Sequence, residues 1–387
     1  MRRLLFLSPK PPYPLSDGGR IRIFQSLYLL SKYFDVDVLY LHEGERIEVV
    51  NSGILGYTKN IYCFNIPKYK QILNAVSGLL NQNPIRNNML YSNKIQDWID
   101  RHIGNYEVVF CQTLRVTEYV IKHSEVTRYV DFVDAVSMNY EKTRFRTSFL
   151  RSLYYNIDFK RISRYEDRIV EIFDKCSIIS TIDKDYIEQR KGMSISNLFV
   201  VGNMVKVTGQ TVIPSKAYRN ILFVGKMSYE PNVLAVTNFV RNVLPCVLKD
   251  YPDTKFYIVG SSPVERVRKL SNENVVVTGF VEDLFDYYSK TSVVIAPMLS
   301  GAGIQNKIIQ AMALGCCVLT TSIGAEGLDE RCGGLVVRNG NEEIANEIMK
   351  LLAQPTLRDE IGRKAREYIL STMTEDVIIE EFKQFFT

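Results

Sequence analysis

Glycines and a lysine with helical spacing stand together in the second half of the chain, in the segment LSGAGIQNKIIQAMALGCCV (residues 299–318). We expect a small-residue loop here after a strand, and then a helix that ends near Leu314. The i, i+4, i+7 spacing of Gly303, Lys307 and Gln310 would place them on one face at the amino end of that helix. Lys307 would add a full positive charge to the partial charge of the helix terminus. The segment predicts a site for a diphosphate with an attached polar group; the alternative is a basic stripe that faces solvent.

A second loop with glycines, SPKPPYPLSDGGR (residues 8–20), follows the first apolar strand. It is roughly 13 residues long, whereas such connections usually have about 2–6. Gly18 and Gly19 would let backbone N–H groups approach an anion at the start of the following helix. Arg20 can donate a charge-assisted hydrogen bond to phosphate. The loop predicts a second anion-binding element, and its alternative is a helix cap with a tight turn.

Two Asp-x-Asp patterns and three histidines are the other residues that could hold a metal. Residues 35–37 fall in an alternating strand, and residues 183–185 open a helix, where carboxylates commonly cap N–H groups. The histidines lack ligand spacing, so we predict no metal site. The chain has no GxxxxGK[ST] motif, no GxSxG motif, and no GxGxxG after its first strand. These absences exclude a P-loop and argue against nicotinamide, flavin and nucleophile-elbow enzymes.

Short apolar runs rich in valine and isoleucine alternate with helix-compatible segments along most of the chain. This alternation is typical of parallel sheets that helices cover on both faces. In the first half we expect helices that include residues 116–122 and a long one over residues 141–174. In the second half, three strands end in Gly225, Gly260 and Gly279, where the chain must turn tightly beside anything bound at the sheet's carboxyl edge.

A segment with little periodicity and several turn formers, residues 203–219, separates the two halves. We predict an N-terminal Rossmann-like domain over residues 1–202, a C-terminal one over residues 220–372, and a final helix over residues 373–387 that can cross back to the first domain. The fold class is α/β, with two doubly wound parallel-sheet domains that face each other across a cleft. Since such sheets bind ligands at the carboxyl ends of their strands, we expect the site in that cleft.

The composition is that of a globular protein, since 46% of the 387 residues are hydrophobic and 24% are charged. No apolar run approaches the roughly 18 residues of a membrane span. The first residues also lack the apolar stretch of about 7–15 residues that a signal peptide needs. The seven cysteines include no CxxC pair, which indicates buried, reduced thiols. We therefore expect a cytoplasmic protein.

The positive charge is concentrated in the first half of the chain. Residues 1–200 contain 28 Lys and Arg against 22 Asp and Glu, a net charge of +6, whereas residues 201–387 contain 20 against 21, a net charge of −1. Much of the excess lies in an aromatic-rich stretch, residues 141–168. Such a helix can attract an anionic membrane surface or a phosphate-bearing lipid, and its alternative is the solvated face of a core helix. Nucleic acid is not expected as a partner, because no nucleic-acid-binding module is present.

Together these motifs resemble those of family 4 glycosyltransferases of the two-Rossmann-domain (GT-B) type, over nearly the whole chain. The similar segments are the Gly-Gly loop, ILFVGKM, VVVTGFVED and above all GAGIQNKIIQAMALGCCVL. The likeness is greatest to the bacterial exopolysaccharide-type branch, which has a G-x-G-x-x-N-K version of the last segment and a pair such as Pro231-Asn232. It implies a retaining, metal-independent enzyme whose second domain binds a nucleotide-activated sugar and whose first domain receives the acceptor.

The resemblance also assigns roles to positions of this chain. Gly19 would lie against the diphosphate, and Lys226, after the strand-end Gly225, matches a basic residue of the family. Phe280 and its neighbours would meet the nucleobase. Catalytic roles are expected for Asp134, Lys226 and Lys307. Contacts with the donor are expected at these positions: Gly18, Gly19, Arg20, Gly225, Gly279, Phe280, Val281, Ala302, Gly303, Ile304 and Gln310.

Three positions depart from the family pattern. Gln310 stands where the family usually has a glutamate that holds the ribose hydroxyls, and Ala302 stands where many members have an earlier glutamate that contacts the sugar. The second basic residue after the strand-end glycine is missing from KMSYEPN. A glutamine can still accept from and donate to ribose, so these departures leave transfer activity open.

We therefore predict a hexosyltransferase-type enzyme that moves a sugar from a UDP- or GDP-linked donor to a bacterial cell-surface glycan, lipid-linked, at the cytoplasmic face of the membrane, with no further cofactor. One alternative, suggested by Gln310 and Ala302, is a non-catalytic sugar-nucleotide-binding partner of another transferase. Another is a nucleotide-sugar epimerase, against which the missing carboxylate and histidine set argues.

Overall fold

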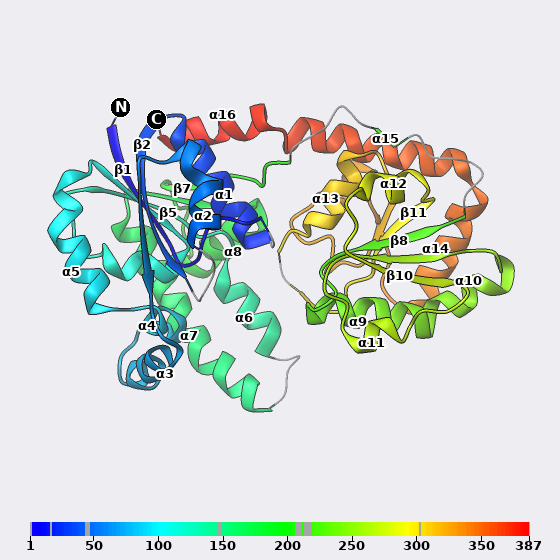
Figure 1. Ribbon diagram of the computed structural model, residues 1–387, viewed down its shortest axis with the longest axis horizontal. Helices are drawn as coiled ribbons and strands as arrows, with labels where there is room; N and C mark the ends of the chain where they lie inside the picture. Colours follow the sequence, from blue (N-terminus) through cyan, green and yellow to red (C-terminus); the bar gives the residue numbers. More distant parts are fainter. Residues whose placement is uncertain are drawn as a thin grey trace. The chain divides into compact units, whose positions relative to one another are not determined.

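The computed structural model describes residues 2–15, 18–42, 47–144, 149–205, 211–212, 219–301 and 303–386. The chain forms two compact units: unit 1 comprises Met1–Asn203 and Ile378–Thr387, and unit 2 comprises Met204–Val377. Each unit contains one parallel sheet, of seven strands in unit 1 and six in unit 2 (Figure 1). The predicted α/β class with two parallel-sheet domains is confirmed. Of the expected linker, residues 206–210 and 213–218 lie outside the described residues.

The sheet of unit 1 has the strand order β3-β2-β1-β4-β5-β6-β7. The order switches direction at β1, which pairs with both β2 and β4, and ligands of such sheets bind outside the strand ends at a switch point. The sequence did not predict β7, a short edge strand. The strands are β1 (Arg2–Ser8), β2 (Phe34–His42), β3 (Asn60–Asn65), β4 (Val108–Gln112), β5 (Thr127–Asp131), β6 (Lys175–Ile178) and β7 (Leu198–Val200).

Helices connect these strands, and two helix predictions need correction. Residues 114–119 form a 3-10 segment, η4, where an α-helix over residues 116–122 was expected. The helix expected over residues 141–174 corresponds to α6, which begins earlier, at Val136, and to α7, which ends at Ile172; residues 145–148 lie outside the described residues. The helices are α1 (Gly18–Ser31), α2 (Ile47–Ile54), α3 (Lys68–Ser77), α4 (Ile85–Met89), α5 (Asn93–His102), α6 (Val136–Arg144), α7 (Phe149–Ile172) and α8 (Thr181–Lys191), with η1 (Leu55–Tyr57), η2 (Gly78–Leu80), η3 (Ile103–Asn105) and η4 (Leu114–Tyr119).

Unit 2 has the strand order β10-β9-β8-β11-β12-β13, with its switch point between β8 and β11. The two-residue strand β13 was not predicted, because it is too short to form a pattern. The strands are β8 (Ile221–Val224), β9 (Phe256–Val259), β10 (Val275–Gly279), β11 (Val293–Ala296), β12 (Val318–Thr320) and β13 (Val336–Val337). The helices are α9 (Glu230–Asn238), η5 (Phe239–Val243), α10 (Leu244–Asp250), α11 (Glu265–Arg268), α12 (Leu284–Ser289), α13 (Asn306–Ala313), η6 (Glu330–Cys332), α14 (Asn341–Ala353) and α15 (Pro355–Thr372).

The last helix, α16 (Glu375–Phe386), joins unit 1 from Ile378 onward. The fully buried ring of Phe385 explains this, because it packs edge-on against Tyr129 of β5 and Phe199 of β7, with ring centroids 5.3 and 5.7 Å away. An aromatic cluster of this kind contributes both apolar burial and favourable edge-to-face geometry. The end of the chain is therefore part of the core of unit 1.

The central strands of both sheets are buried on both faces, which explains the continuous apolar runs in the sequence. In β1 the side chains from Leu4 to Leu7 are at most 1% exposed. The cysteines are free thiols, and four of them are buried. Cys63 and Cys332 are only half-buried and Cys246 is exposed, so the prediction of buried thiols was wrong for Cys246 and only partly right for the other two. Cys246 lies on the exposed face of α10, whereas Leu244 and Val247 lie on its buried face.

Candidate functional site

The three strand-end glycines of unit 2 lie side by side at the carboxyl edge of the sheet, since β8, β9 and β10 are neighbours. The amide of Gly225 donates to Val259 O (3.0 Å), and the amide of Gly260 donates to Gly279 O (3.0 Å). A Cβ atom on Gly260 would lie 1.8 Å from Gly225 O, and the φ angles of Gly260 and Gly279 are +149° and +76°. Only glycine fits this approach without strain, and the edge therefore presents bare backbone.

Lys307 lies in the first turn of α13, and its side chain is half-buried. Its Nζ donates to Asn232 Oδ1 (2.6 Å) and lies 4.9 Å from the centre of the Phe223 ring. Asn232 is itself buried and donates through Nδ2 to Lys226 O (3.0 Å). Burial lowers the pKa of Lys307 to about 8, because desolvation disfavours the charged amine. A bound anion would stabilise the protonated form of this amine.

The expected helical stripe of Gly303, Lys307 and Gln310 is only partly present. The helix α13 begins at Asn306, so Gly303 precedes it, with φ at +72° in the turn that leads into the helix. The amide of Gly303 donates to Glu326 Oε2 (3.0 Å). An anion that accepts from this amide must take the place of the Glu326 carboxylate. Gln310 lies on α13 with an exposed side chain.

The other donor positions are placed as follows. Lys226 directly follows Gly225 and has an exposed side chain. The ring of Phe280 is 76% exposed at the end of β10, and Val281 packs partly against the core. Ile304 packs closely against Gly327, because a Cβ atom on Gly327 would lie only 2.6 Å from Ile304 Cγ1. Ala302 lies outside the described residues.

In unit 1, Gly18 and Gly19 form the first turn of α1, whereas the sequence suggested that the helix begins after them. Both are exposed. Arg20 is directed back to its own loop, where Nη1 donates to Tyr13 O (3.5 Å). Gly19 also lines a cavity of about 200 Å³ at the carboxyl ends of β1, β4 and β5. Residues that directly follow each of these strands form part of its wall.

Asp134 lines this cavity and accepts a hydrogen bond from Asn139 Nδ2 (2.7 Å). Burial raises the pKa of Asp134 to about 7, and the nearby carboxylates of Asp183 and Glu166 act in the same direction. Arg115 opposes the shift. A carboxyl group with such a pKa can accept or release a proton near neutral pH.

Two strained residues lie in the same wall. Thr113 and Val133, directly after Gln112 of β4 and near the end of β5, have φ angles of +73° and +70°. A β-branched residue in this region is a genuine outlier, and such strain persists where the surrounding structure holds it. Asp131 holds both, because its backbone oxygen accepts from Thr113 N (2.8 Å) and its Oδ1 accepts from Val133 N (3.2 Å).

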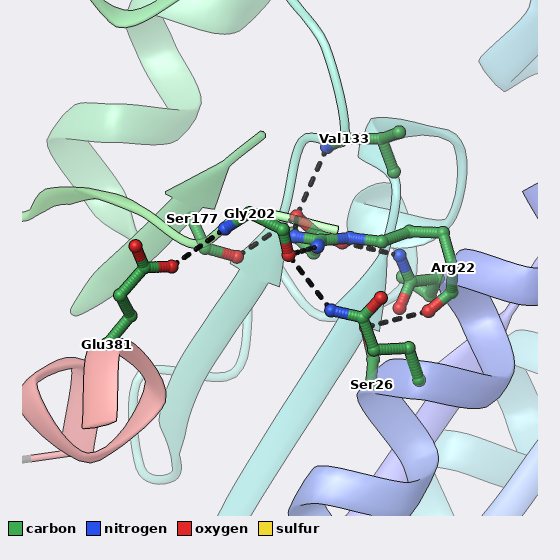
Figure 2. A network of polar contacts seen from close by, with 9 residues as sticks. Arg22, Ser26, Val133, Ser177, Gly202 and Glu381 are labelled. Atoms are coloured by element: carbon green, nitrogen blue, oxygen red, sulfur yellow. Dashed lines mark hydrogen bonds and ion pairs between the residues drawn. The ribbon is translucent and has the colours of Figure 1, made fainter. Parts of the chain in front are cut away.

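A buried polar network in unit 1 joins Arg22, Ser177, Gly202 and Glu381 (Figure 2). Asp131, which is fully buried, is its centre. Its carboxylate accepts from Arg22 on α1, from Gln112 Nε2 (2.7 Å) and from Ser177 Oγ (3.0 Å). Arg22 Nη1 also donates to Gly202 O (2.6 Å), whose amide donates to Glu381 of α16 (2.9 Å). The network fixes the strand ends and α1 relative to one another within unit 1.

The two Asp-x-Asp patterns have protein partners. Asp37 accepts from Arg3, Asn60 and the Tyr106 hydroxyl, at 3.1, 2.9 and 2.9 Å. Asp183 lies in the first turn of α8, but the cap of that helix is Ser180, whose Oγ accepts from Asp183 N (3.2 Å). The Asp183 carboxylate accepts from Ser180 Oγ and from Ala135 N (2.9 Å). In the part of the chain that the structure describes, no three His, Cys, Asp or Glu side chains are grouped so as to hold a metal ion. Over the same residues, no helix combines the length and the apolar character needed to cross a membrane.

Sequence reasoning missed four residues of these sites. Asn232 was noticed only as part of a Pro-Asn pair, and nothing in the sequence connects Glu326 with the glycine loop. Arg86 and Arg115 also line the cavity of unit 1. Arg115 could have been noticed as a basic residue that closely follows an apolar strand, in VVFCQTLR.

Comparison with known proteins identifies the second unit. Residues 218–354 match the family model of group 1 glycosyl transferases. An uncharacterised 44.6 kDa protein in the cps region of Klebsiella pneumoniae is 26% identical, over 95% of this chain and 96% of its own. The capsular polysaccharide biosynthesis glycosyltransferase CapM of Staphylococcus aureus is 29% identical over 150 residues, 36% of this chain and 39% of its own.

The fold is shared with solved glycosyltransferase structures. HepE of Anabaena, solved in complex with UDP and glucose, has a TM-score of 0.68 at 12% identity, over 100% of this chain and 99% of its own. This likeness covers both units and agrees with their two parallel sheets. The chain is therefore a glycosyltransferase with two Rossmann-like domains, and its match to the group 1 family lies in residues 218–354.

Proposed function

We propose that the protein is a retaining, metal-independent transferase of family 4 that moves a sugar from a UDP- or GDP-linked donor to a bacterial cell-surface glycan. The observation that carries the proposal is the half-buried Lys307, held by Asn232 beside three strand-end glycines. Among the described residues no carboxylate forms an ion pair with Lys307, and a half-buried amine of this kind suits a diphosphate. The cps region that contains the gene of the Klebsiella relative, the capsular polysaccharide biosynthesis role of CapM and the UDP bound to HepE support the donor and the glycan class.

In the proposed reaction, the bond from the sugar anomeric carbon to the diphosphate oxygen breaks, and a bond to an acceptor hydroxyl oxygen forms with the same configuration. The hydroxyl gives up its proton, and the diphosphate leaves with the electron pair of the broken bond. Lys307 and Lys226 would neutralise the leaving diphosphate, which is the role that a metal has in other transferases. Phe280 offers an exposed ring to the nucleobase. Asp134, with a pKa of about 7, is the candidate to position or deprotonate the acceptor hydroxyl.

The test is a thermal-shift screen with UDP, GDP, dTDP and their sugars, each with and without EDTA, followed by an assay for nucleotide release with a membrane extract as acceptor. We expect one nucleotide to raise the melting temperature equally with and without EDTA, because a ligand stabilises the state that binds it. Lys307→Met should abolish that shift while the protein remains folded. A shift that EDTA removes would contradict metal independence.

The non-catalytic alternative keeps a specific observation in its favour, because Gln310 replaces the usual glutamate and has an exposed side chain. It predicts nucleotide binding without hydrolysis or transfer for any acceptor. Gln310→Glu distinguishes the two cases: in an active enzyme it should change the donor KM, whereas in a binding partner no turnover should appear with either residue.

The proposed membrane contact has a clearer basis in α3 than in residues 141–168. Large apolar side chains with helical spacing are exposed on one face of α3 and η2. A solvent-exposed helix face usually carries polar side chains instead. Six of the apolar side chains are each more than half exposed: Tyr69, Ile72, Leu73, Val76, Leu79 and Leu80. Such an apolar face is typical of a helix that lies in a membrane interface.

A basic residue of α7 contacts η2, which carries the end of this apolar face. Arg161 donates to Gly78 O (2.9 Å) and Leu79 O (3.0 Å), which holds α7 against η2. On α7 the side chains of Lys160, Arg164 and Arg168 are exposed at i, i+4, i+8 spacing. Apolar and cationic groups together suit an anionic lipid surface. We therefore propose that α3 and α7 attach the enzyme to the membrane that carries its lipid-linked acceptor.

Flotation with vesicles of phosphatidylcholine containing one third phosphatidylglycerol tests this proposal. The double variant Ile72→Ser/Leu73→Ser should lose vesicle binding, and raised salt should weaken it in the wild type. Met193→Ser is the matched control, since Met193 is equally exposed, at 61%, but lies after α8. Equal flotation of the double variant and the wild type would overturn the assignment of α3.

A further inference from the structure

Two cavities of unit 1 share a wall of positively charged side chains. One has a volume of about 290 Å³ and the other about 200 Å³, and Lys10, Arg86 and Arg115 line both. Arg20 adds a further positive charge to the larger cavity. Asp134 is the acidic residue in the smaller one. The basic residues follow β1, lie on α4 and follow β4, so the positive wall stands at the carboxyl edge of the sheet.

The two arginines repel each other, and the carboxylates that act on them through space are Asp134 on Arg115 and Asp158 on Arg86. Burial, with the charge of Arg86, lowers the pKa of Arg115. In the described part of the chain, neither guanidinium forms an ion pair with Asp or Glu, and Arg86 instead faces the hydroxyl groups of Tyr140 and Tyr154. Asp134, the nearby carboxyl group, is itself only partly ionised at neutral pH. The cavity therefore carries an excess of positive charge that a bound anion would balance.

The arginines are fixed rather than gathered by chance on a loose surface. Asn87, next to Arg86 on α4, donates to Leu114 O (2.9 Å), next to Arg115 on η4. The start of α4 is held by Asp158 Oδ1, which accepts from Ile85 N (2.9 Å). The amide of Arg115 donates to Thr113 Oγ1 (3.3 Å). Two guanidinium groups on such fixed supports form a preorganised pair of donor forks, which suits phosphate geometry.

We propose that the acceptor is anionic and that Arg86 and Arg115 bind a phosphate ester that it carries. This inference rests on the proposed function, in which unit 1 receives the acceptor. Because the cavities extend beyond the space between the arginines, the phosphate would sit against the positive wall while the attached saccharide fills the rest. The substrate class is thus a phosphorylated or phosphate-linked glycan, and a neutral glycan would leave the two arginines without a counter-charge.

Calorimetric titration of the full chain with glucose 1-phosphate, with UDP at saturation, tests the proposal. We expect saturable binding that becomes at least tenfold weaker in Arg115→Gln and in Arg86→Gln, while UDP affinity is unchanged. Arg101→Gln is the matched control, because it removes one exposed positive charge of α5 in the same unit. Wild-type affinity for glucose 1-phosphate in both pocket variants would overturn the proposal, as would the absence of saturable binding of glucose 1-phosphate and inorganic phosphate to the wild type.

Two further arms separate the possible failures. If UDP does not bind at all, the proposed donor function fails, but glucose 1-phosphate binding that Arg115→Gln removes and Lys307→Met leaves intact still supports the phosphate site. If Lys307→Met removes that binding instead, the sugar phosphate occupies unit 2 and the inference is wrong. Glucuronate that binds as tightly as glucose 1-phosphate would replace the phosphate assignment with a carboxylate one.

Discussion

Arg22 and Asp131 form a buried ion pair in unit 1, with Arg22 Nε 2.8 Å from Asp131 Oδ2 and both side chains at most 4% exposed. Arg22 stands on α1, just after the glycine turn, and Asp131 ends β5, just before the strained Val133. The pair therefore connects the two elements that contribute Gly19 and Asp134 to one cavity. Its role is to hold these elements in position, since both charges are satisfied within the protein (Figure 2).

Arg22→Met should lower the free energy of unfolding by about 3–5 kcal/mol, because it leaves the Asp131 carboxylate buried without its cation. Urea denaturation measures the change. The matched control is Arg2→Met, which breaks an ion pair of similar length, 2.9 Å, between side chains that are more than half exposed. That exposed pair should contribute less than about 1 kcal/mol. Equal losses in the two variants would contradict the structural role of the buried pair.

The same ion pair gives the stability a defined pH dependence. Arg22 lowers the pKa of Asp131 in the folded protein. A carboxyl group with a depressed pKa stabilises the fold above its ordinary pKa range, and this contribution is lost as the pH falls through and below that range. Asp131→Asn should therefore flatten the loss of stability below about pH 4. Urea midpoints of the wild type and the variant between pH 3 and pH 7 would show it.

Gly260→Ala should destabilise unit 2 by more than about 3 kcal/mol, since a Cβ atom would lie 1.8 Å from Gly225 O and the φ angle is positive. The strand ends must separate to relieve this clash, so UDP binding should be lost as well. Gly104→Ala is the control, because a Cβ atom there meets no atom within 4 Å. If Gly260→Ala retains both wild-type stability and UDP binding, the edge does not need bare backbone.

The fold was largely predictable because parallel strands that are buried on both faces leave long apolar runs, as in RLLFLS and NILFVG. The short edge strands β7 and β13 were not predictable, since two or three residues form no period. A helix was expected over residues 116–122, but the chain instead forms a 3-10 segment over Leu114–Tyr119, directly after Thr113 with its positive φ angle. Local propensity does not encode such strand-end strain.

The candidate sites were predictable only where a chain segment carries its own pattern. The glycine loop before α13 and Lys307 are local in the sequence. Asn232 and Glu326, in contrast, reach Lys307 and Gly303 from 75 and 23 residues away. Arg86 and Arg115 converge through the packing of α4 on η4, which the Asn87–Leu114 hydrogen bond fixes. Contacts of this kind come from topology, and no spacing rule in the sequence contains them.

UDP affinity should fall as the pH rises through the pKa of Lys307, which burial lowers to about 8. The protonated amine binds the diphosphate, so we expect affinity to drop about tenfold between pH 7 and pH 9. In Lys307→Met the affinity should be weak at every pH, without that slope. Lys290→Met, which removes an exposed lysine of the same unit, should keep the wild-type profile.

Asn232→Asp provides a second test of the Lys307 site. The new carboxylate would lie within hydrogen-bond distance of Lys307 Nζ, since Asn232 Oδ1 is 2.6 Å away. An adjacent negative charge raises the pKa of the amine and competes with the diphosphate. UDP affinity should therefore fall by about tenfold, and its alkaline slope should move to higher pH. An unchanged slope with reduced affinity would show that Asn232 acts through packing alone.

Transfer activity should decline as the pH falls below about 7, because Asp134 then becomes protonated and can no longer accept the proton of the acceptor hydroxyl. Asp134→Asn should lower kcat by about 10²–10⁴-fold and remove this acid limb, while UDP affinity stays unchanged. The matched control is Asp185→Asn, an exposed carboxylate of α8, which should retain the wild-type profile. If Asp134→Asn lowers kcat but keeps the acid limb, the titrating group is another residue, and Asp134 only positions the acceptor.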